Sequence, residues 1–161
     1  MKKIDELLFK LICWICSGLM FSMMMLICMQ VFFRYVLQAS LPWSEELARY
    51  IFIWMSFLGI VAAYYKGRHM AFDLLLVKAK GMFKKGLDIA MDILTIIMAA
   101  AMVIGGNAMV QVGTMQRSPA LSLPMHIVFV VMPISGALLL YFALRNLWGK
   151  FVASKVQEVE G

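Results

Sequence analysis

Two thiols lie three residues apart near the start of the chain, in the string CWIC at Cys13 and Cys16. Thiol–disulfide oxidoreductases use this spacing, because one thiolate attacks a disulfide and the other releases the product. Their sites follow a βαβ pattern, whereas Cys13 and Cys16 lie inside an apolar run, where a helix only places them on one face. The third cysteine, Cys28, lies in the same run, so no disulfide framework is indicated. A small membrane thiol-redox enzyme that uses Cys13 and Cys16 nevertheless stays open as one of two candidate functions.

Two carboxylates, Asp88 and Asp92, stand one helical turn apart. Paired carboxylates inside a membrane segment can bind a cation or relay protons. Lys84 and Lys85 precede them at the spacing of helical ion pairs, and a helix start also favours acidic side chains. The sequence leaves the role of Asp88 and Asp92 open between these interpretations.

Three charged residues, Glu45, Glu46 and Arg49, stand at the start of an apolar run in the string LPWSEELAR. A helix start has free backbone N–H groups and a positive dipole end, which stabilise a carboxylate by about 0.3–1 kcal/mol. Arg49 follows Glu45 by four residues and Glu46 by three, so on a helix it can pair with either. These charges either only stabilise the end of the helix, or they form an outer rim with Trp43 to which another protein docks. Both explanations stay open at this point.

The surrounding sequence is far more apolar than a soluble domain. Apolar residues make up 63% of the 161 residues and the mean hydropathy is +0.87, whereas soluble domains have about 45–50% apolar residues. A helix of roughly 20 apolar residues crosses the hydrocarbon core of a bilayer. We therefore predict an all-α membrane protein, one domain over residues 1–161, with four spans at approximately 11–33, 47–65, 87–113 and 125–148.

Basic residues gather on one side of these spans. Twelve lysines and arginines lie within residues 2–10, 66–85 and 145–155, whereas the opposite loops hold only Arg34 and Arg117. Short loops rich in lysine and arginine stay in the cytoplasm, so we predict that both termini are cytoplasmic. The net charge of +6 follows this membrane topology and therefore does not indicate nucleic-acid binding.

The segment between the second and third spans is amphipathic. Its apolar residues recur at helical spacing, and basic and acidic residues fall between them. We predict an interfacial helix over approximately residues 69–84, with its lysines directed to anionic lipid headgroups.

Local signals predict helix ends, kinks and close contacts. Ser44 suits the N-cap of the second span, Pro133 is expected to kink the fourth, and residues 105–107 (GGN) are expected to loosen the third. Small residues four positions apart favour close approach between membrane helices. Two such pairs occur, Gly18 with Ser22 and Gly59 with Ala63.

Polar residues within the spans are few and scattered. Secondary transporters usually have repeated halves and paired broken helices around a polar midplane site, and this chain has neither pattern. On the predicted topology His69 and His126 lie on opposite sides of the membrane, so they cannot hold one haem. We therefore expect that the chain moves no solute by itself, is no enzyme, and binds no cofactor or metal.

A long string from Phe32 to Leu75, FFRYVLQASLPWSEELARYIFIWMSFLGIVAAYYKGRHMAFDLL, resembles the small membrane subunit (DctQ type) of tripartite ATP-independent periplasmic, or TRAP, transporters. The string SPALSLP, followed by Pro133, resembles the start of that family's last helix, while His126 stands where relatives often carry an aromatic residue. The matching positions are Arg34, Tyr35, Leu41, Pro42, Trp43, Glu45, Glu46, Leu47, Ala48, Arg49, Phe57, Leu58, Gly59, Gly67, His69 and Asp73.

The resemblance implies an accessory, scaffold-like permease subunit of the bacterial inner membrane with four spans. Such a subunit packs beside a large DctM-type membrane subunit, which holds the sodium and solute sites, and a periplasmic solute-binding protein delivers the solute. The solute is usually an organic acid such as a C4-dicarboxylate or a sialic acid.

The resemblance also assigns roles to particular residues of this chain. An outer rim of Arg34, Trp43, Glu45, Glu46 and Arg49 is expected to contact the partner proteins. On the inner side, Arg68, His69 and Asp73 are expected to pack the interfacial helix.

Overall fold

The computed structural model describes residues 2–67 and 82–159. Residues 68–81 lie outside the described part, and with them Arg68, His69, Asp73 and most of the predicted interfacial helix. Those predictions therefore remain predictions.

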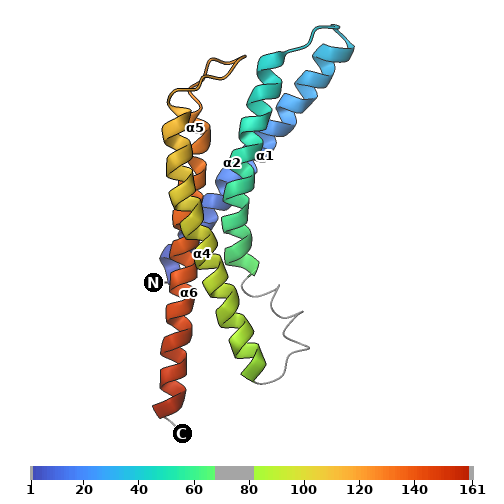
Figure 1. The fold of residues 1–161 in the computed structure, drawn as a ribbon. Coiled ribbons are helices and arrows are strands. Elements are labelled where there is room, and N and C mark those ends of the chain that lie inside the picture. The colour runs from blue at the N-terminus through green and yellow to red at the C-terminus, as the bar shows by residue number, and fades with distance from the viewer. Residues whose placement is uncertain (1, 68–81, 160–161) are drawn as a thin grey trace.

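The described residues form helices joined by short irregular segments (Figure 1). They are α1 (Lys2–Tyr35), α2 (Pro42–Gly67), α4 (Met82–Gly113), α5 (His126–Phe129) and α6 (Val131–Val159). Four stretches are long and apolar enough to cross a membrane: Asp5–Tyr35, Pro42–Lys66, Ile89–Gly113 and His126–Trp148, the last formed by α5 and α6 together. The prediction of an all-helical chain with four spans is confirmed.

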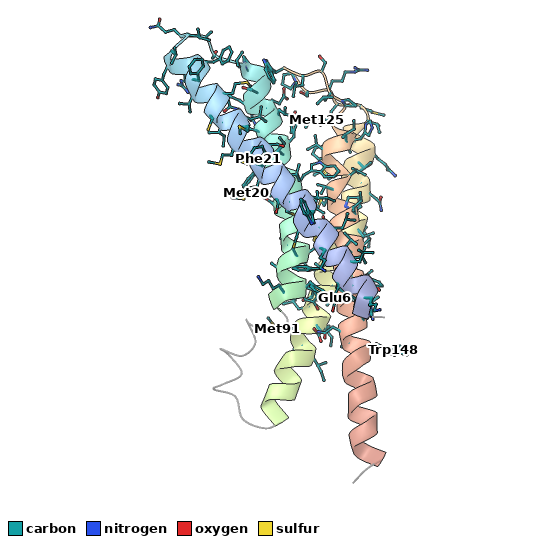
Figure 2. The ribbon with its side chains drawn as sticks, turned by 180° about the vertical axis from the view of Figure 1, so that it is seen from behind. Glu6, Met20, Phe21, Met91, Met125 and Trp148 are labelled. Carbon is teal, nitrogen blue, oxygen red and sulfur yellow. The ribbon has the colours of Figure 1, made fainter. Side chains whose placement is uncertain are left out.

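The helices pack as two pairs that cross. α1 packs along α2 and α4 packs along α6, while contacts between α2 and α6 join the pairs. In Figures 1 and 2 the pairs lie together near the middle of the bundle and separate toward the end that carries the loop between α1 and α2. We call this the outer end, following the predicted topology; it also carries residues 114–125, the outer loop.

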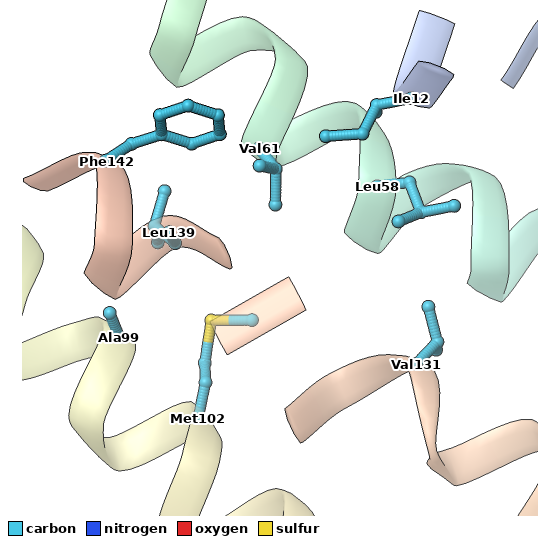
Figure 3. Close-up of a cluster of buried hydrophobic side chains, with 8 residues drawn as sticks. All are labelled: Ile12, Leu58, Val61, Ala99, Met102, Val131, Leu139 and Phe142. Carbon is cyan, nitrogen blue, oxygen red and sulfur yellow. The ribbon is translucent and has the colours of Figure 1, made fainter. Parts of the chain in front are cut away.

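All four spans contribute side chains to one apolar core (Figure 3). Aromatic rings extend this core toward the inner end, where Tyr65 stacks on Phe9 with centroids 4.7 Å apart and meets Phe142 at 5.2 Å. The buried members of the core are Ile12, Leu58, Val61, Ala99, Met102, Val131, Leu139 and Phe142.

Three glycines allow close contact between α4 and the fourth span: Gly106 and Gly113 on α4, which meet α6 and α5, and Gly136 on α6. A Cβ at Gly106 would lie 2.7 Å from Cδ of Pro133, and one at Gly113 would lie 2.8 Å from the backbone nitrogen of His126. A Cβ at Gly18 or Gly59 would meet nothing within 4 Å. Within the described part of this chain neither glycine faces a packed helix, so the close approach that their spacing favours stays a prediction.

The structure bears on two predictions about helix irregularity. The fourth span is interrupted at Val130, between α5 and α6, because Pro133 has no N–H to donate; the backbone at Val130 stays in the α region, so the kink itself remains a prediction. The loosening at residues 105–107 is wrong, since α4 continues through them to Gly113. Packing of Gly106 against Pro133 holds this stretch helical.

A polar cluster fixes α1 to α6 near the inner end. Arg145 forms an ion pair with Asp5, and its Nη1 also donates a hydrogen bond to the hydroxyl of Tyr141, 3.2 Å away. The Tyr141 hydroxyl in turn donates to Oδ1 of Asp5 at 3.3 Å. Because the side chains of Arg145 and Asp5 are only 25% and 13% exposed, we expect their ion pair to be less screened by solvent than a fully exposed one.

We predict a coupling free energy of about 1 kcal/mol between Asp5 and Arg145, at the upper end of the range typical of exposed pairs. The measurement is a double-mutant cycle with Asp5→Ala and Arg145→Ala, followed by unfolding in detergent. Glu6→Ala is the matched control, because Glu6 is an exposed acidic neighbour on the same helix. Strictly additive effects of the two substitutions would contradict the prediction.

Candidate partner-binding rim at the outer end

The residues assigned to the outer rim divide into exposed and buried members. Arg34 in the last turn of α1 is exposed, as are Glu45 and Arg49 in the first turns of α2, and Trp43 is 39% exposed. Glu46 differs, since only 6% of its surface is exposed. Four of the five predicted rim residues are therefore available to a partner, and Glu46 is not.

The carboxylate of Glu46 joins α2 to the outer loop. Its Oε2 accepts hydrogen bonds from the backbone N–H groups of Ala120 (2.9 Å) and Leu121 (3.1 Å). Its Oε1 accepts one from the hydroxyl of Tyr50, one turn further along α2, at 2.5 Å. These donors satisfy a buried charge that would otherwise be costly.

The outer loop itself is a tight turn around Ser118, which is buried. The backbone N–H of Ser118 donates to the carbonyl of Leu123 (2.9 Å), and that of Ser122 donates back to the carbonyl of Ser118 (3.0 Å). Ser122 adopts a left-handed backbone with φ of 54°. The backbone bonds within the turn do not use the N–H of Ala120. This N–H donates to the Glu46 carboxylate instead, so the hydrogen bonding of the turn is completed by α2.

The structure changes two local predictions at this end. Among the described residues, Arg49 forms no ion pair with Glu45 or Glu46, because the Glu46 carboxylate is turned to the loop amides. Ser44 is not the N-cap, since α2 already begins at Pro42 and the Ser44 hydroxyl donates to the carbonyl of Leu41 at 2.8 Å. Proline is favourable at the first helical position, where its missing N–H costs nothing.

A second buried carboxylate, Asp92, lies toward the inner end between three helices. It is 2% exposed, and its Oδ1 accepts hydrogen bonds from Nδ2 of Asn146 on α6 (2.8 Å) and from the hydroxyl of Tyr64 on α2 (3.4 Å). The sequence singled out Asp92 but gave no signal for either partner, since they are 54 and 28 residues away. Asp92 therefore has a structural role in joining α2, α4 and α6.

Residues 23–153 match the family model described as "Tripartite ATP-independent periplasmic transporters, DctQ component". The chain belongs to the DctQ family. The resemblance found on the string from Phe32 to Leu75 is thus confirmed over most of the chain.

Two curated relatives of this DctQ chain carry TRAP names. It is 29% identical, over 81% of its length, to the isethionate TRAP transporter permease protein DctMQ of Oleidesulfovibrio alaskensis. It is 26% identical, over 77% of its length and 77% of the relative, to the putative TRAP transporter small permease protein of Haemophilus influenzae. The DctQ chain spans only 22% of the length of the first relative.

DctQ membership makes the chain a small permease subunit of a TRAP transporter, and it does not favour the thiol-redox alternative. Cys13 and Cys16 are free thiols on α1, each half-buried. In the described part of the DctQ chain, no group of three or more histidine, cysteine, aspartate or glutamate residues is placed to hold a metal ion.

Proposed function

We propose that this chain is a scaffold-like accessory subunit of a sodium-coupled TRAP transporter, formed as one domain over residues 1–161. It packs beside a DctM-type large subunit that holds the sodium and solute sites, and a periplasmic binding protein delivers the solute. The observation that carries the proposal is the family match over residues 23–153. The printed name of the relative from O. alaskensis, DctMQ, supports the large subunit as the partner.

The amount of exposed apolar surface supports the scaffold role. Only 6% of the most apolar window of α1 is buried within the chain, against 39% for the span formed by α5 and α6. Met20 and Phe21 of α1 are 65% and 62% exposed (Figure 2). Such surface is covered by lipid or by another membrane protein, so α1 offers a broad flank to a neighbour.

The topology and the solute belong to the same proposal. Both termini lie in the cytoplasm, because twelve basic residues lie on that side of the inner membrane. The solute is a small organic acid, and a C4-dicarboxylate or a sialic acid fits the family resemblance. One relative is named for isethionate, a sulfonate, so sulfonates are candidates as well. The chain itself is no enzyme and binds no cofactor, since sodium belongs to the large subunit.

The outer rim is proposed to receive the binding protein. The exposed charged side chains of the rim are Arg34, Glu45 and Arg49, and the adjoining outer loop adds Arg117, which makes three cations and one anion. This excess of positive charge suits an acidic surface on a soluble partner, because complementary charges speed encounter and fix orientation.

Reconstitution tests the proposed function. Proteoliposomes containing this chain alone are expected to take up no labelled organic acid above the protein-free background. Adding the large subunit, the loaded binding protein and an inward sodium gradient should give uptake, which should fall when the small subunit is left out. Uptake by the small subunit alone would refute the accessory role.

A further inference from the structure

We propose that Glu46 is a positioning residue, which holds the outer loop against α2 so that Arg49 and Arg117 form one rigid docking surface for an acidic patch of a soluble protein. The inference rests on the proposed function and deepens it. It departs from the sequence-based assignment, in which Glu46 itself contacted the partner.

The burial of Glu46 carries the first step. A side chain that is 6% exposed and accepts hydrogen bonds from Ala120, Leu121 and Tyr50 has no free face for a partner's cation. Any effect of Glu46 on docking therefore passes through the groups it holds. Two of its donors are backbone N–H groups of the outer loop, so what it fixes is the course of that loop.

The loop provides the second step, since its own hydrogen bonds do not fix it to α2. The backbone bonds of Ser118, Ser122 and Met125 close the turn onto itself. The described hydrogen bonds that reach from this loop to α2 are those of Glu46, together with the weaker one from the Tyr50 hydroxyl to the sulfur of Met125 at 3.4 Å. Without the carboxylate, the turn loses its main polar attachment.

The position of the arginines provides the third step. Arg49 lies on α2, three residues after Glu46, and Arg117 lies in the outer loop, three residues before Ala120, so each of the two joined segments carries one arginine. Both side chains are exposed. Their relative positions are set only while the junction is closed, and a fixed spacing of charges is what a folded protein surface can recognise.

A fixed loop also favours a protein partner over lipid headgroups as the source of negative charge. Headgroups diffuse and adapt to any arrangement of arginines, so they gain nothing from an immobilised turn. A folded partner gains affinity from preorganisation, because the loop need not be ordered during binding.

The test uses the complete transporter in nanodiscs of neutral lipid, with fluorescently labelled binding protein. Glu46→Ala is expected to weaken docking about tenfold, the effect of moving loop ordering into the binding step. Glu46→Gln should retain most of the affinity, since its oxygen can accept from the two loop amides and its NH₂ can donate to the Tyr50 hydroxyl. Glu6→Ala, at an exposed acid on α1 outside the rim, is the control and should not weaken docking.

Two further measurements separate a positioning role from a merely structural one. Hydrogen exchange at the amides of Ala120 and Leu121 should speed up in Glu46→Ala and stay slow in Glu46→Gln, while association with the large subunit stays intact. Arg49→Gln with Arg117→Gln should reduce the salt dependence of docking without changing that exchange.

Each outcome bears on a separate claim. If the wild-type complex does not bind the binding protein at all, the proposed docking function fails. If the wild type docks, and Glu46→Ala docks equally well although its loop amides exchange fast, the positioning role is overturned. If the arginine substitutions act only in nanodiscs of anionic lipid, the surface binds headgroups and the protein partner is overturned. Loss of docking in Glu46→Gln as well as in Glu46→Ala would mean that the Glu46 carboxylate contacts the binding protein directly, which would also overturn the positioning role.

Discussion

Gly106→Ala is expected to lower the free energy of unfolding of the bundle by about 1–3 kcal/mol, the cost of overpacking a filled contact. The added Cβ would lie 2.7 Å from Cδ and 2.8 Å from the backbone nitrogen of Pro133. These atoms belong to a rigid ring and to the main chain, so no side-chain rotation can relieve the conflict. α6 must move away from α4, and the close contact between them is lost.

The adjacent glycine provides the control for this prediction. A Cβ at Gly105 meets nothing within 4 Å, so Gly105→Ala should leave stability unchanged or raise it by up to about 1 kcal/mol, through the helix propensity of alanine. Unfolding of both variants in detergent with increasing denaturant measures the difference. Equal stability of Gly106→Ala and Gly105→Ala would show that the contact between α4 and Pro133 does not limit the packing.

Asp92→Ala is expected to destabilise the inner half of the bundle by about 1–3 kcal/mol for each buried donor that loses its acceptor. The donors are Nδ2 of Asn146 and the hydroxyl of Tyr64, which belong to α6 and α2. Asp92→Asn should cost much less, because its carbonyl oxygen can keep the 2.8 Å bond to Asn146. Thermal unfolding of the two variants checks this order.

The same pair of variants tests the cation or proton site that the sequence left open for Asp92. If Asp92 only joins three helices, the complete transporter with Asp92→Asn should retain sodium-driven uptake at close to the wild-type rate. If Asp92 carries a cation or a proton, Asp92→Asn should abolish uptake while stability is preserved, since the neutral amide cannot do that chemistry. We expect retained uptake, because the carboxylate is used by helix contacts.

Several features that depend on local sequence were predicted correctly. Length and hydropathy located four spans, because a helix must satisfy its backbone within its own segment when it crosses a membrane. Pro133 located the interruption between α5 and α6, since a proline acts on the turn that precedes it. The string from Phe32 to Leu75 placed the chain in its family, which the match over residues 23–153 confirmed.

The glycine contacts could not be predicted from spacing. Gly18 and Gly59 have the expected small neighbours four residues away, yet open space surrounds both, whereas Gly106 packs against Pro133. Spacing states only which residues share one face of a helix. Which face meets another helix depends on the crossing of the whole bundle.

Sequence alone therefore determined that this is a four-span membrane subunit of the DctQ family, and that charged residues gather at the start of α2. Only the tertiary structure decided what those charges do. Glu46 turns to amides 74 and 75 residues away, and Arg49 stays exposed. The physical reason is that a buried carboxylate takes whatever donors the packed helices bring to it, and backbone N–H groups of a distant loop leave no pattern in the sequence.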